Sequence, residues 1–271
     1  MKKAHFLILL LLLQGCNVLH KDVSKKKEDG VIAHRGAWRS GKLPQNSVAA
    51  LQSAIALKCY GSEFDVHLTK DNVLVLNHDH DFFGLPVEHS TYQELLSRKL
   101  ENGEFIPTAE SFINTAIKQK DTKLIMELKP SKLGKSRSLQ LAVAAVALVN
   151  KLHARSLVEY ISFDYDILKK IVELDTEARV AYLGSDVAPQ KLKEDGFAGL
   201  DYHHGALKKN SGWIAEAKKL GLSVNVWTVN SKDDIRYFLD QGVDFITTDE
   251  PELAKQVWRE IAPSVNGQGF Y

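Results

Sequence analysis

The sequence predicts an α/β protein folded as a (β/α)₈ barrel, with a small insertion after the second strand. Two observations predict this fold. Short apolar runs alternate along the 271 residues with stretches whose apolar residues recur at helical spacing, which is typical of a parallel sheet covered by helices. About eight such units fit from Val31 onward, and this number favours a closed barrel. An open, doubly wound sheet usually carries a glycine-rich phosphate turn, and we do not find one.

The strands of the barrel are expected in eight short apolar segments. They are Val31–His34, Gly61–Leu68, Lys123–Leu128, Val158–Ser162, Arg179–Leu183, Gly199–Asp201, Leu222–Thr228 and Phe245–Thr247. Amphipathic stretches separate most of them, so successive strands are expected to run parallel.

The helices are predicted from apolar periodicity and from residues that favour helix ends. The periodic stretches are Asn46–Lys58, Leu139–Leu152, Asp164–Leu174, Gly212–Leu220 and Asp233–Asp240. Asn46, Asp164 and Ser231 are residue types that favour the N-cap position. Gly221 and Gly242 are typical of positions just after a helix.

The segment from Asp71 to Lys120 interrupts this alternation. It contains an extra strand at Val73–Asn77, a loop with glycine and proline, and helical stretches near Thr91–Lys99 and Thr108–Lys120. We interpret it as an enlarged connection after the second strand that forms a small lid. The sequence shows no internal repeat and no linker, so residues 30–271 are expected to form one domain.

Residues 1–15 resemble a bacterial lipoprotein signal peptide. Lys2 and Lys3 precede an apolar run, Phe6–Leu13, that is too short to span a bilayer as a helix. Gly15 then precedes Cys16, and the resemblance implies cleavage before Cys16 and lipidation of its sulfur. We therefore expect an exported protein, lipid-anchored in the bacterial cell envelope on its periplasmic or surface face. A plain secretory peptide is the alternative.

The composition excludes some classes of partner. Residues 16–29 are polar and rich in lysine and are expected to be a flexible tether. The net charge is +1 and no basic helix with interleaved aromatic residues is visible, so we expect no nucleic-acid partner. We predict no protein partner.

Cys59 is the single cysteine of residues 30–271, so no disulfide forms within the domain, and we expect its thiol to be buried near a helix end.

Polar side chains follow several of the predicted strands. The first strand ends in His34 and Arg35, the second carries Glu63 and Asp65 two residues apart, and the extra strand is followed by His78. The third barrel strand ends in Glu127 and Lys129, also two residues apart. Residues two apart on a strand point to one face, and the C-terminal ends of barrel strands form the active site in this architecture.

These residue types together indicate phosphoester chemistry. Three carboxylates in one barrel mouth repel one another unless a cation neutralises them, and oxygen ligands select Mg²⁺ or Ca²⁺ over zinc. Arg35 and Lys129 supply the positive charges that a phosphate needs. Two histidines, His34 and His78, can accept and donate a proton on opposite sides of a phosphorus centre. The set predicts metal-assisted phosphoester cleavage.

The chain resembles the glycerophosphodiester phosphodiesterase family. The matching motifs are HRG at 34–36, PQNS at 44–47, EFDVHLTKD at 63–71, VLNHD at 75–79, MELK at 126–129, VNVWTVN at 224–230 and DFITTDEP at 244–251. They occur in order over nearly all of the expected domain. The resemblance implies a (β/α)₈ barrel that hydrolyses deacylated phospholipids to sn-glycerol 3-phosphate and an alcohol.

The resemblance also implies roles for individual residues. His34 and His78 match the catalytic pair, and we favour His34 as the base. Glu63, Asp65 and Glu127 match the ligands of a divalent cation, Ca²⁺ or Mg²⁺. The residues that match substrate contacts are Arg35 and Lys129 at the phosphate and Trp227 beside the glycerol or the leaving group. The family usually has Glu where this chain has Gln45, a change that removes a charge beside Arg35.

Two other functions stay open from the sequence. One is a phospholipase-type diesterase acting on lysophospholipid or phosphoinositide, and the other is a non-catalytic lipoprotein that binds phosphodiesters. Among the remaining histidines, His67 shares the face of Glu63 and can reach the rim of the cleft. His203 and His204 can line the pocket, and His80 and His89 are expected to have no direct role.

Overall fold

The computed structural model describes residues 29–261 of the chain. The predicted signal peptide at residues 1–15, the lipidation site Cys16 and all but the last residue of the tether lie outside the described residues. No helix between residues 29 and 261 is long and apolar enough to cross a membrane.

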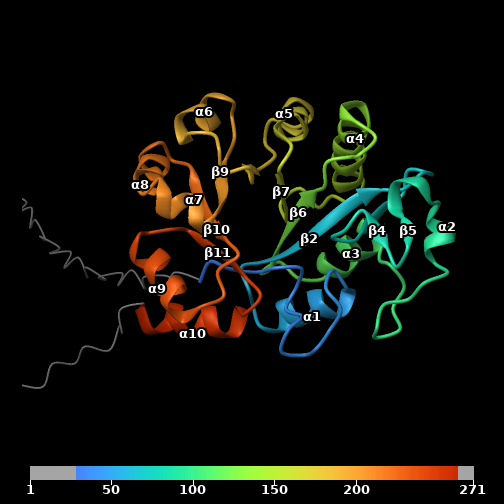
Figure 1. Ribbon diagram of the computed structural model, residues 1–271, viewed down its shortest axis with the longest axis horizontal. Coiled ribbons are helices and arrows are strands. Elements are labelled where there is room, and N and C mark those ends of the chain that lie inside the picture. The colour runs from blue at the N-terminus through green and yellow to red at the C-terminus, as the bar shows by residue number, and fades with distance from the viewer. Residues whose placement is uncertain (1–28, 262–271) are drawn as a thin grey trace, which may run out of the picture.

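The described chain forms a closed parallel barrel of eight strands, a TIM barrel, as the sequence predicts (Figure 1). Its strands are β1 (Val31–Ala33), β2 (Gly61–Leu68), β6 (Lys123–Leu128), β7 (Val158–Ser162), β8 (Val180–Tyr182), β9 (Gly199–His203), β10 (Ser223–Trp227) and β11 (Phe245–Thr248). Strand β1 pairs in parallel with both β2 and β11, and these two pairings close the barrel. All eight strands therefore end at the same mouth.

Helices surround the strands and cover the outside of the barrel (Figure 1). They are α1 (Val48–Ala56), α3 (Ala109–Ala116), α4 (Lys135–Lys151), α5 (Tyr165–Leu174), α6 (Pro189–Glu194), α7 (His204–Lys209), α8 (Gly212–Lys219), α9 (Lys232–Asp240) and α10 (Pro251–Ile261). Outward-facing strand residues such as Phe64, Met126 and Tyr202 pack with the helices in one large core cluster. Burial of this apolar surface is the main contribution to stability.

The inside of the barrel has its own, smaller core. Ile32, Ile125, Ile161 and Leu183 project inward from β1, β6, β7 and the end of β8 and form one cluster. Because residues two apart on a strand face the same side, His34 and Glu127, which follow Ile32 and Ile125 by two residues, face inward nearer the mouth. The apolar layer thus supports the polar side chains above it.

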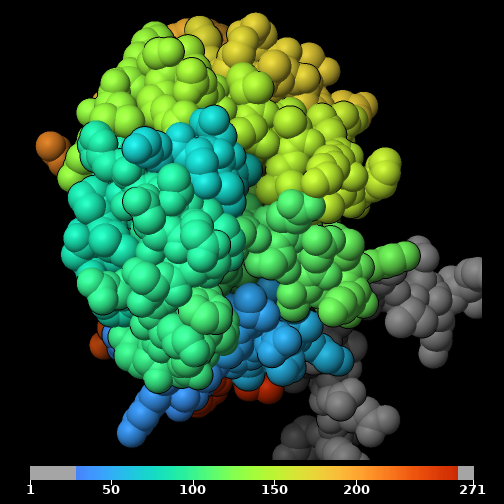
Figure 2. All heavy atoms as spheres, turned by 90° about the vertical axis from the view of Figure 1, so that its right-hand side faces the viewer, coloured from blue at the N-terminus to red at the C-terminus, as the bar shows by residue number. Residues whose placement is uncertain are grey.

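The insertion after β2 is confirmed and has a core of its own. Strand β3 (Leu74–Leu76) pairs antiparallel with the end of β2, and a hairpin of β4 (Asp81–Phe82) and β5 (Leu85–Pro86) follows. A 3₁₀ turn, η1 (Val87–His89), and the short helix α2 (Tyr92–Leu95) complete it. Its buried residues Val75, Phe82, Val87, Leu95 and Ile106 form a separate cluster. Figure 2 shows the insertion, cyan to green, spread over one side of the molecule.

Some predicted boundaries were wrong. Ser47, and not Asn46, is the N-cap of α1, where its hydroxyl accepts a hydrogen bond from the backbone N–H of Ala50. Asn46 has a left-handed backbone, with φ of 58°. The caps at Asp164 and Ser231 are confirmed. Helix α4 starts at Lys135, four residues before the predicted Leu139, because its first turn is polar and gives no apolar period.

Candidate active site

A recess opens at the mouth of the barrel, where the strands end. It offers about 110 Å³ of space to a water-sized sphere. Its lining residues are His34, Arg35, Glu63, His78, Glu127, Lys129, Ile161, Phe163, Leu183, Asp201, Trp227 and Thr247. Seven of the eight predicted catalytic, metal and substrate residues of the domain are in this lining, and the eighth, Asp65, contacts them.

The three carboxylates predicted as metal ligands lie together. Glu63 and Asp65 are two residues apart on β2 and share a face, and Asp65 is in register with Glu127 on the neighbouring strand β6. One oxygen from each of the three lies within 4.8 Å of the others. All three residues are buried, with Glu127 the most exposed at 8 %.

The electrostatics of this cluster fit a divalent cation. Burial and the neighbouring carboxylates Asp65 and Glu127 raise the pKa of Glu63 well above its ordinary value. Burial and Asp65 likewise raise the pKa of Glu127 to about 7. Glu63 Oε1 has no hydrogen-bond partner among the residues described. A hard cation bound by carboxylate oxygens would neutralise this repulsion and complete the open coordination.

Lys129 holds the opposite side of the cluster. Its Nζ lies 2.8 Å from Glu127 Oε1 and 3.2 Å from Asp65 Oδ1. Burial lowers the pKa of Lys129, but the two carboxylates outweigh burial and hold that pKa above its ordinary value. Burial also opposes the ionisation of Asp65, yet Lys129 and Arg35 hold its pKa below its ordinary value.

Arg35 is placed by an unusual backbone turn after β1. Its φ is 56°, and its backbone N–H donates to Glu63 Oε2 at 2.7 Å. Its guanidinium donates to Gln45 Oε1 at 2.6 Å, and its Nε lies 3.6 Å from Asp65 Oδ2. Gln45 is therefore a direct neighbour of the guanidinium and contacts it through a neutral amide.

Gly36 completes this turn, and glycine is required there. Its φ is 82°, a left-handed conformation. An added Cβ would lie 2.6 Å from the Cβ of Ala50 and 2.7 Å from its carbonyl carbon. The close approach of the loop to α1 thus sets the direction in which Arg35 leaves the strand.

Each of the two predicted catalytic histidines has an acidic neighbour. His34 Nδ1 lies 2.8 Å from Asp249 Oδ1, and Asn230 donates to the other oxygen of Asp249. With Nδ1 so bonded, Nε2 is the ring nitrogen left for proton transfer. His78 Nδ1 lies 2.7 Å from Asp79 Oδ1 at a more exposed position. Burial lowers the pKa of His78, with Lys129 and Arg35 contributing and Asp65 opposing.

Two residues that orient this site were missed from the sequence. Asp249 lies within the DFITTDEP motif but was given no role. Asn46 lies in PQNS, and its side chain both donates to Asp65 Oδ2 at 2.9 Å and accepts from the backbone N–H of Asp65 at 3.0 Å. The motifs pointed to both, but their contacts join segments far apart in the sequence and no local pattern indicates them.

Trp227 lies on the apolar side of the recess, where the sequence predicts it. Its Nε1 donates to the carbonyl of Asp201 at 2.9 Å, and its ring packs edge-on against Phe163 with centroids 5.5 Å apart. Neither His203 nor His204 is among the residues that line the recess. The ring of His203 packs edge-on against Trp227, with centroids 5.2 Å apart.

The expectation that His67 reaches the cleft rim is wrong. Its side chain is buried, at 1 % exposure. Its Nε2 lies 3.4 Å from the carbonyl of His78, and its ring packs against His80. Strand β3 pairs with this end of β2 and extends the sheet, and the ring of His80 packs against His67 with centroids 4.9 Å apart. The insertion therefore encloses His67.

The mouth of this TIM barrel joins three buried carboxylates, Arg35, Lys129 and two histidines. This set of side chains suits a divalent cation and a phosphate, as in metal-assisted hydrolases. A sequence profile of the Glycerophosphoryl diester phosphodiesterase family matches residues 34–253. The chain belongs to this family.

Individual relatives agree with this membership. A glycerophosphodiester phosphodiesterase structure from Parabacteroides distasonis is 41% identical, spans 87% of this chain and 98% of its own, and has a TM-score of 0.84. The glycerophosphodiester phosphodiesterase of Caldanaerobacter subterraneus is 28% identical over 240 residues, 82% of this chain and 94% of the relative.

A more distant structure shows the fold alone. An Oleispira antarctica phosphodiesterase, solved in complex with the product sn-glycerol-3-phosphate, is 24% identical with a TM-score of 0.74. It spans 84% of this chain and 96% of its own.

Proposed function

We propose that this protein hydrolyses glycerophosphodiesters, the deacylated forms of phospholipids, to sn-glycerol 3-phosphate and an alcohol. One observation carries the proposal. In a chain of this family, the carboxylate cluster, Arg35, Lys129, His34 and His78 meet at one recess that is open to small molecules. Two relatives named glycerophosphodiester phosphodiesterase, which this chain matches over nearly their full length, support it.

Glu63, Asp65 and Glu127 would hold the divalent cation, Ca²⁺ or Mg²⁺. When bound, the cation supplies positive charge that stabilises the phosphate oxygens as negative charge builds up on them. The choice between the two ions depends on cavity size and ligand number. Arg35 and Lys129 would bind the phosphate from the other side, since both line the recess beside the carboxylates.

The histidines would move the protons. In the first step the glycerol hydroxyl next to the ester attacks phosphorus, His34 Nε2 accepts its proton, and the P–O bond to the alcohol breaks. His78 gives its proton to the departing alcohol oxygen. Water then opens the cyclic phosphate with the two proton transfers reversed, which yields sn-glycerol 3-phosphate. Asp249 would orient the ring of His34 through the hydrogen bond at Nδ1.

We also propose that the protein is exported and anchored to the cell envelope through a lipid on Cys16. The support is the sequence of residues 1–16 alone. The test is metabolic labelling with radioactive palmitate in a bacterial host, comparing the full chain with Cys16→Ser. Label on the parent chain and none on the variant is expected. Equal labelling of both, or of neither, contradicts the anchor.

The catalytic proposal is tested with His34→Ala, using glycerophosphocholine and lysophosphatidylcholine as substrates. The parent protein is expected to prefer glycerophosphocholine, and the variant to lose at least about 100-fold in kcat. His89→Ala changes an exposed histidine in the insertion and serves as the matched control. Full activity of His34→Ala contradicts the proposed role, and a preference for lysophosphatidylcholine indicates the phospholipase-type alternative. An inactive parent that binds glycerophosphocholine indicates the non-catalytic one.

A further inference from the structure

Asp201 is a buried carboxyl in the recess to which the mechanism above gives no role. It lies in the middle of β9 and is 2 % exposed. It is in register with Asn225 of β10, and both project into the barrel. Its Oδ1 has no hydrogen-bond partner in residues 29–261.

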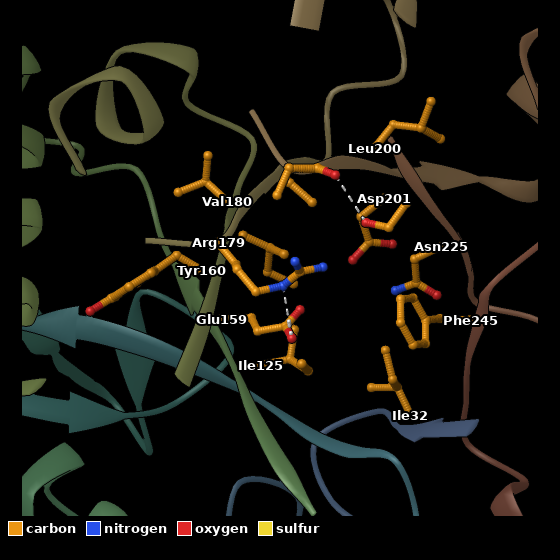
Figure 3. A pocket seen from close by; sticks show the side chains of 14 residues that line it. Ile32, Ile125, Glu159, Tyr160, Arg179, Val180, Leu200, Asp201, Asn225 and Phe245 are labelled. Carbon is orange, nitrogen blue, oxygen red and sulfur yellow. Dashed lines mark hydrogen bonds and ion pairs between the residues drawn. The ribbon is translucent and has the colours of Figure 1, made fainter. Parts of the chain in front are cut away.

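The surroundings of Asp201 form a polar patch inside the apolar barrel. Asn225 donates to Thr247 Oγ1 at 2.8 Å, while its own Oδ1 is also unpartnered within the described chain. A small cavity of about 20 Å³ lies against both residues and against Ile32, Ile125 and Phe245. Figure 3 shows Asp201 and Asn225 directing their polar ends into it. The cavity has room for one water molecule.

Burying a carboxyl with one oxygen lacking a hydrogen-bond partner costs stability. Burial, with a smaller contribution from Glu127, raises the pKa of Asp201 to about 7, against the opposing effect of Asn225. A buried polar atom without a partner in the protein indicates that a water molecule or a bound ligand supplies the partner. Because Asp201 lines the recess as well as the cavity, a bound molecule in the recess can reach it.

The chemistry of that molecule follows from the rest of the recess, and here the inference depends on the proposed function. In that mechanism the phosphate contacts Arg35 and Lys129, and the attacking hydroxyl faces His34. The terminal hydroxyl of the glycerol is the one group left without a partner. Phe163, 42 % exposed at the rim, and Trp227 offer an apolar surface to the leaving alcohol. The enclosed, polar floor suits the small hydroxylated end.

We propose that Asp201 hydrogen-bonds the terminal hydroxyl of the glycerol moiety and thereby selects glycerol over other alcohols at that end of the diester. Trp227 Nε1 donates to the carbonyl of Asp201 and so fixes the strand at this point. This hydrogen bond therefore holds Asp201 in a fixed position relative to Trp227, which lies on the leaving-group side of the recess.

The experiment compares two substrates that differ in one hydroxyl. One is glycerophosphocholine, and the other carries propane-1,2-diol in place of glycerol, which keeps the attacking hydroxyl and lacks the terminal one. For the full-length parent protein, kcat/KM is expected to fall about 10- to 100-fold on the second substrate. Asp201→Ala is expected to lose the same factor on glycerophosphocholine and to stay within about twofold of the parent on the diol substrate.

Two further variants separate this role from a structural one. Asp201→Asn keeps the size and a hydrogen-bonding group, so it is expected to retain most of the preference for glycerol. Ser223→Ala changes a polar residue that lines only the cavity below, and it is expected to leave both rates unchanged.

The outcomes that contradict the inference are distinct from failure of the proposed function. Equal losses of Asp201→Ala on both substrates show a structural role and contradict the inference. A parent protein that does not distinguish the two substrates contradicts it without any variant, even if Asp201→Ala fails to fold. A parent protein that hydrolyses neither contradicts the proposed function, and the inference with it.

Discussion

At the scale of single residues, Asn46 supports one of the predicted metal ligands, Asp65, through two hydrogen bonds. It holds both the side chain and the backbone N–H of Asp65 from a left-handed turn just before α1. Groups that orient a metal ligand in this way typically contribute 10- to 100-fold in affinity or activity. The residue therefore connects the first loop of the barrel to the carboxylate cluster.

We expect Asn46→Ala to weaken binding of the divalent cation by about 10- to 100-fold. Asp65 would lose two hydrogen bonds and its carboxylate would turn more freely. Calorimetric titration with Ca²⁺ and with Mg²⁺ measures the effect. Asn150→Ala, on the exposed side of α4, is the control. Equal affinity in the two variants would show that Asn46 does not support the cluster.

Asp249 gives a prediction about acid stability. Burial opposes its ionisation, but hydrogen bonds from His34 and Asn230 hold its pKa at about 2. Because this lies below the value of about 3.9 in an unfolded chain, its stabilisation of about 2 kcal/mol is complete above about pH 5 and is lost as the pH falls toward 2. Urea unfolding of the parent and of Asp249→Asn measures it. The difference in free energy of unfolding is expected to shrink between pH 6 and pH 2.5, and a constant difference refutes it.

At the scale of elements, the turn between β1 and α1 sets the geometry of the site. Gly36 combines a positive φ with close contact to Ala50. Gly103 in the insertion has a similar φ of 86° but no atom within 4 Å of an added Cβ. Comparing substitutions at Gly36 and Gly103 therefore separates the free-energy cost of backbone strain from that of a steric clash.

Gly103→Ala is expected to destabilise the protein by about 1 kcal/mol, the cost of left-handed backbone alone. Gly36→Ala is expected to cost about 2–4 kcal/mol, because α1 must also move. Thermal unfolding of the two variants beside the parent gives the comparison. Similar melting temperatures for both variants would mean that the contact with Ala50 relaxes freely.

The elements also show what sequence could predict. The eight barrel strands and the insertion follow directly from alternation of apolar runs, and each strand lies within two residues of its predicted range. The hairpin of β4 and β5 and the helices α6, α7 and α10 were not predicted. The hairpin and the first two helices are two to six residues long, too short for periodicity to be detected.

For the site, the sequence predicts the functional residues that lie at the ends of strands. It does not predict contacts between loops that are far apart in the sequence. Glu63, Asp65 and Glu127 share a face by strand alternation alone, and the structure brings them together. The contact between His34 and Asp249 spans 215 residues. The prediction that His67 reaches the rim of the cleft was wrong for a related reason. The alternation of side chains along a strand gives the face on which a residue lies, but not which other residues pack over that face.

At the scale of the whole molecule, the barrel depends on its packed core, since residues 29–261 contain a single cysteine and no disulfide. Cys59 is the free cysteine of residues 29–261 and is 1 % exposed. Burial raises the pKa of its thiol to about 12. It contributes to packing as a small apolar residue.

We therefore expect the Cys59 thiol to be inert in the folded protein. In the full chain carrying Cys16→Ser, iodoacetamide at pH 8 is expected to leave Cys59 unmodified until denaturant is added. Mass spectrometry of the intact protein detects the added group. Rapid labelling without denaturant would contradict the burial of this residue and the packing around α1.

The most direct test of the central claim is release of sn-glycerol 3-phosphate from glycerophosphoethanolamine and glycerophosphocholine, measured by a coupled assay. The protein is first treated with EDTA, and Ca²⁺ or Mg²⁺ is then restored. The account predicts no release with EDTA and full release with at least one of the two ions, because Glu63, Asp65 and Glu127 repel one another without a cation. Release that is undiminished in EDTA, or no release with either ion, would contradict it.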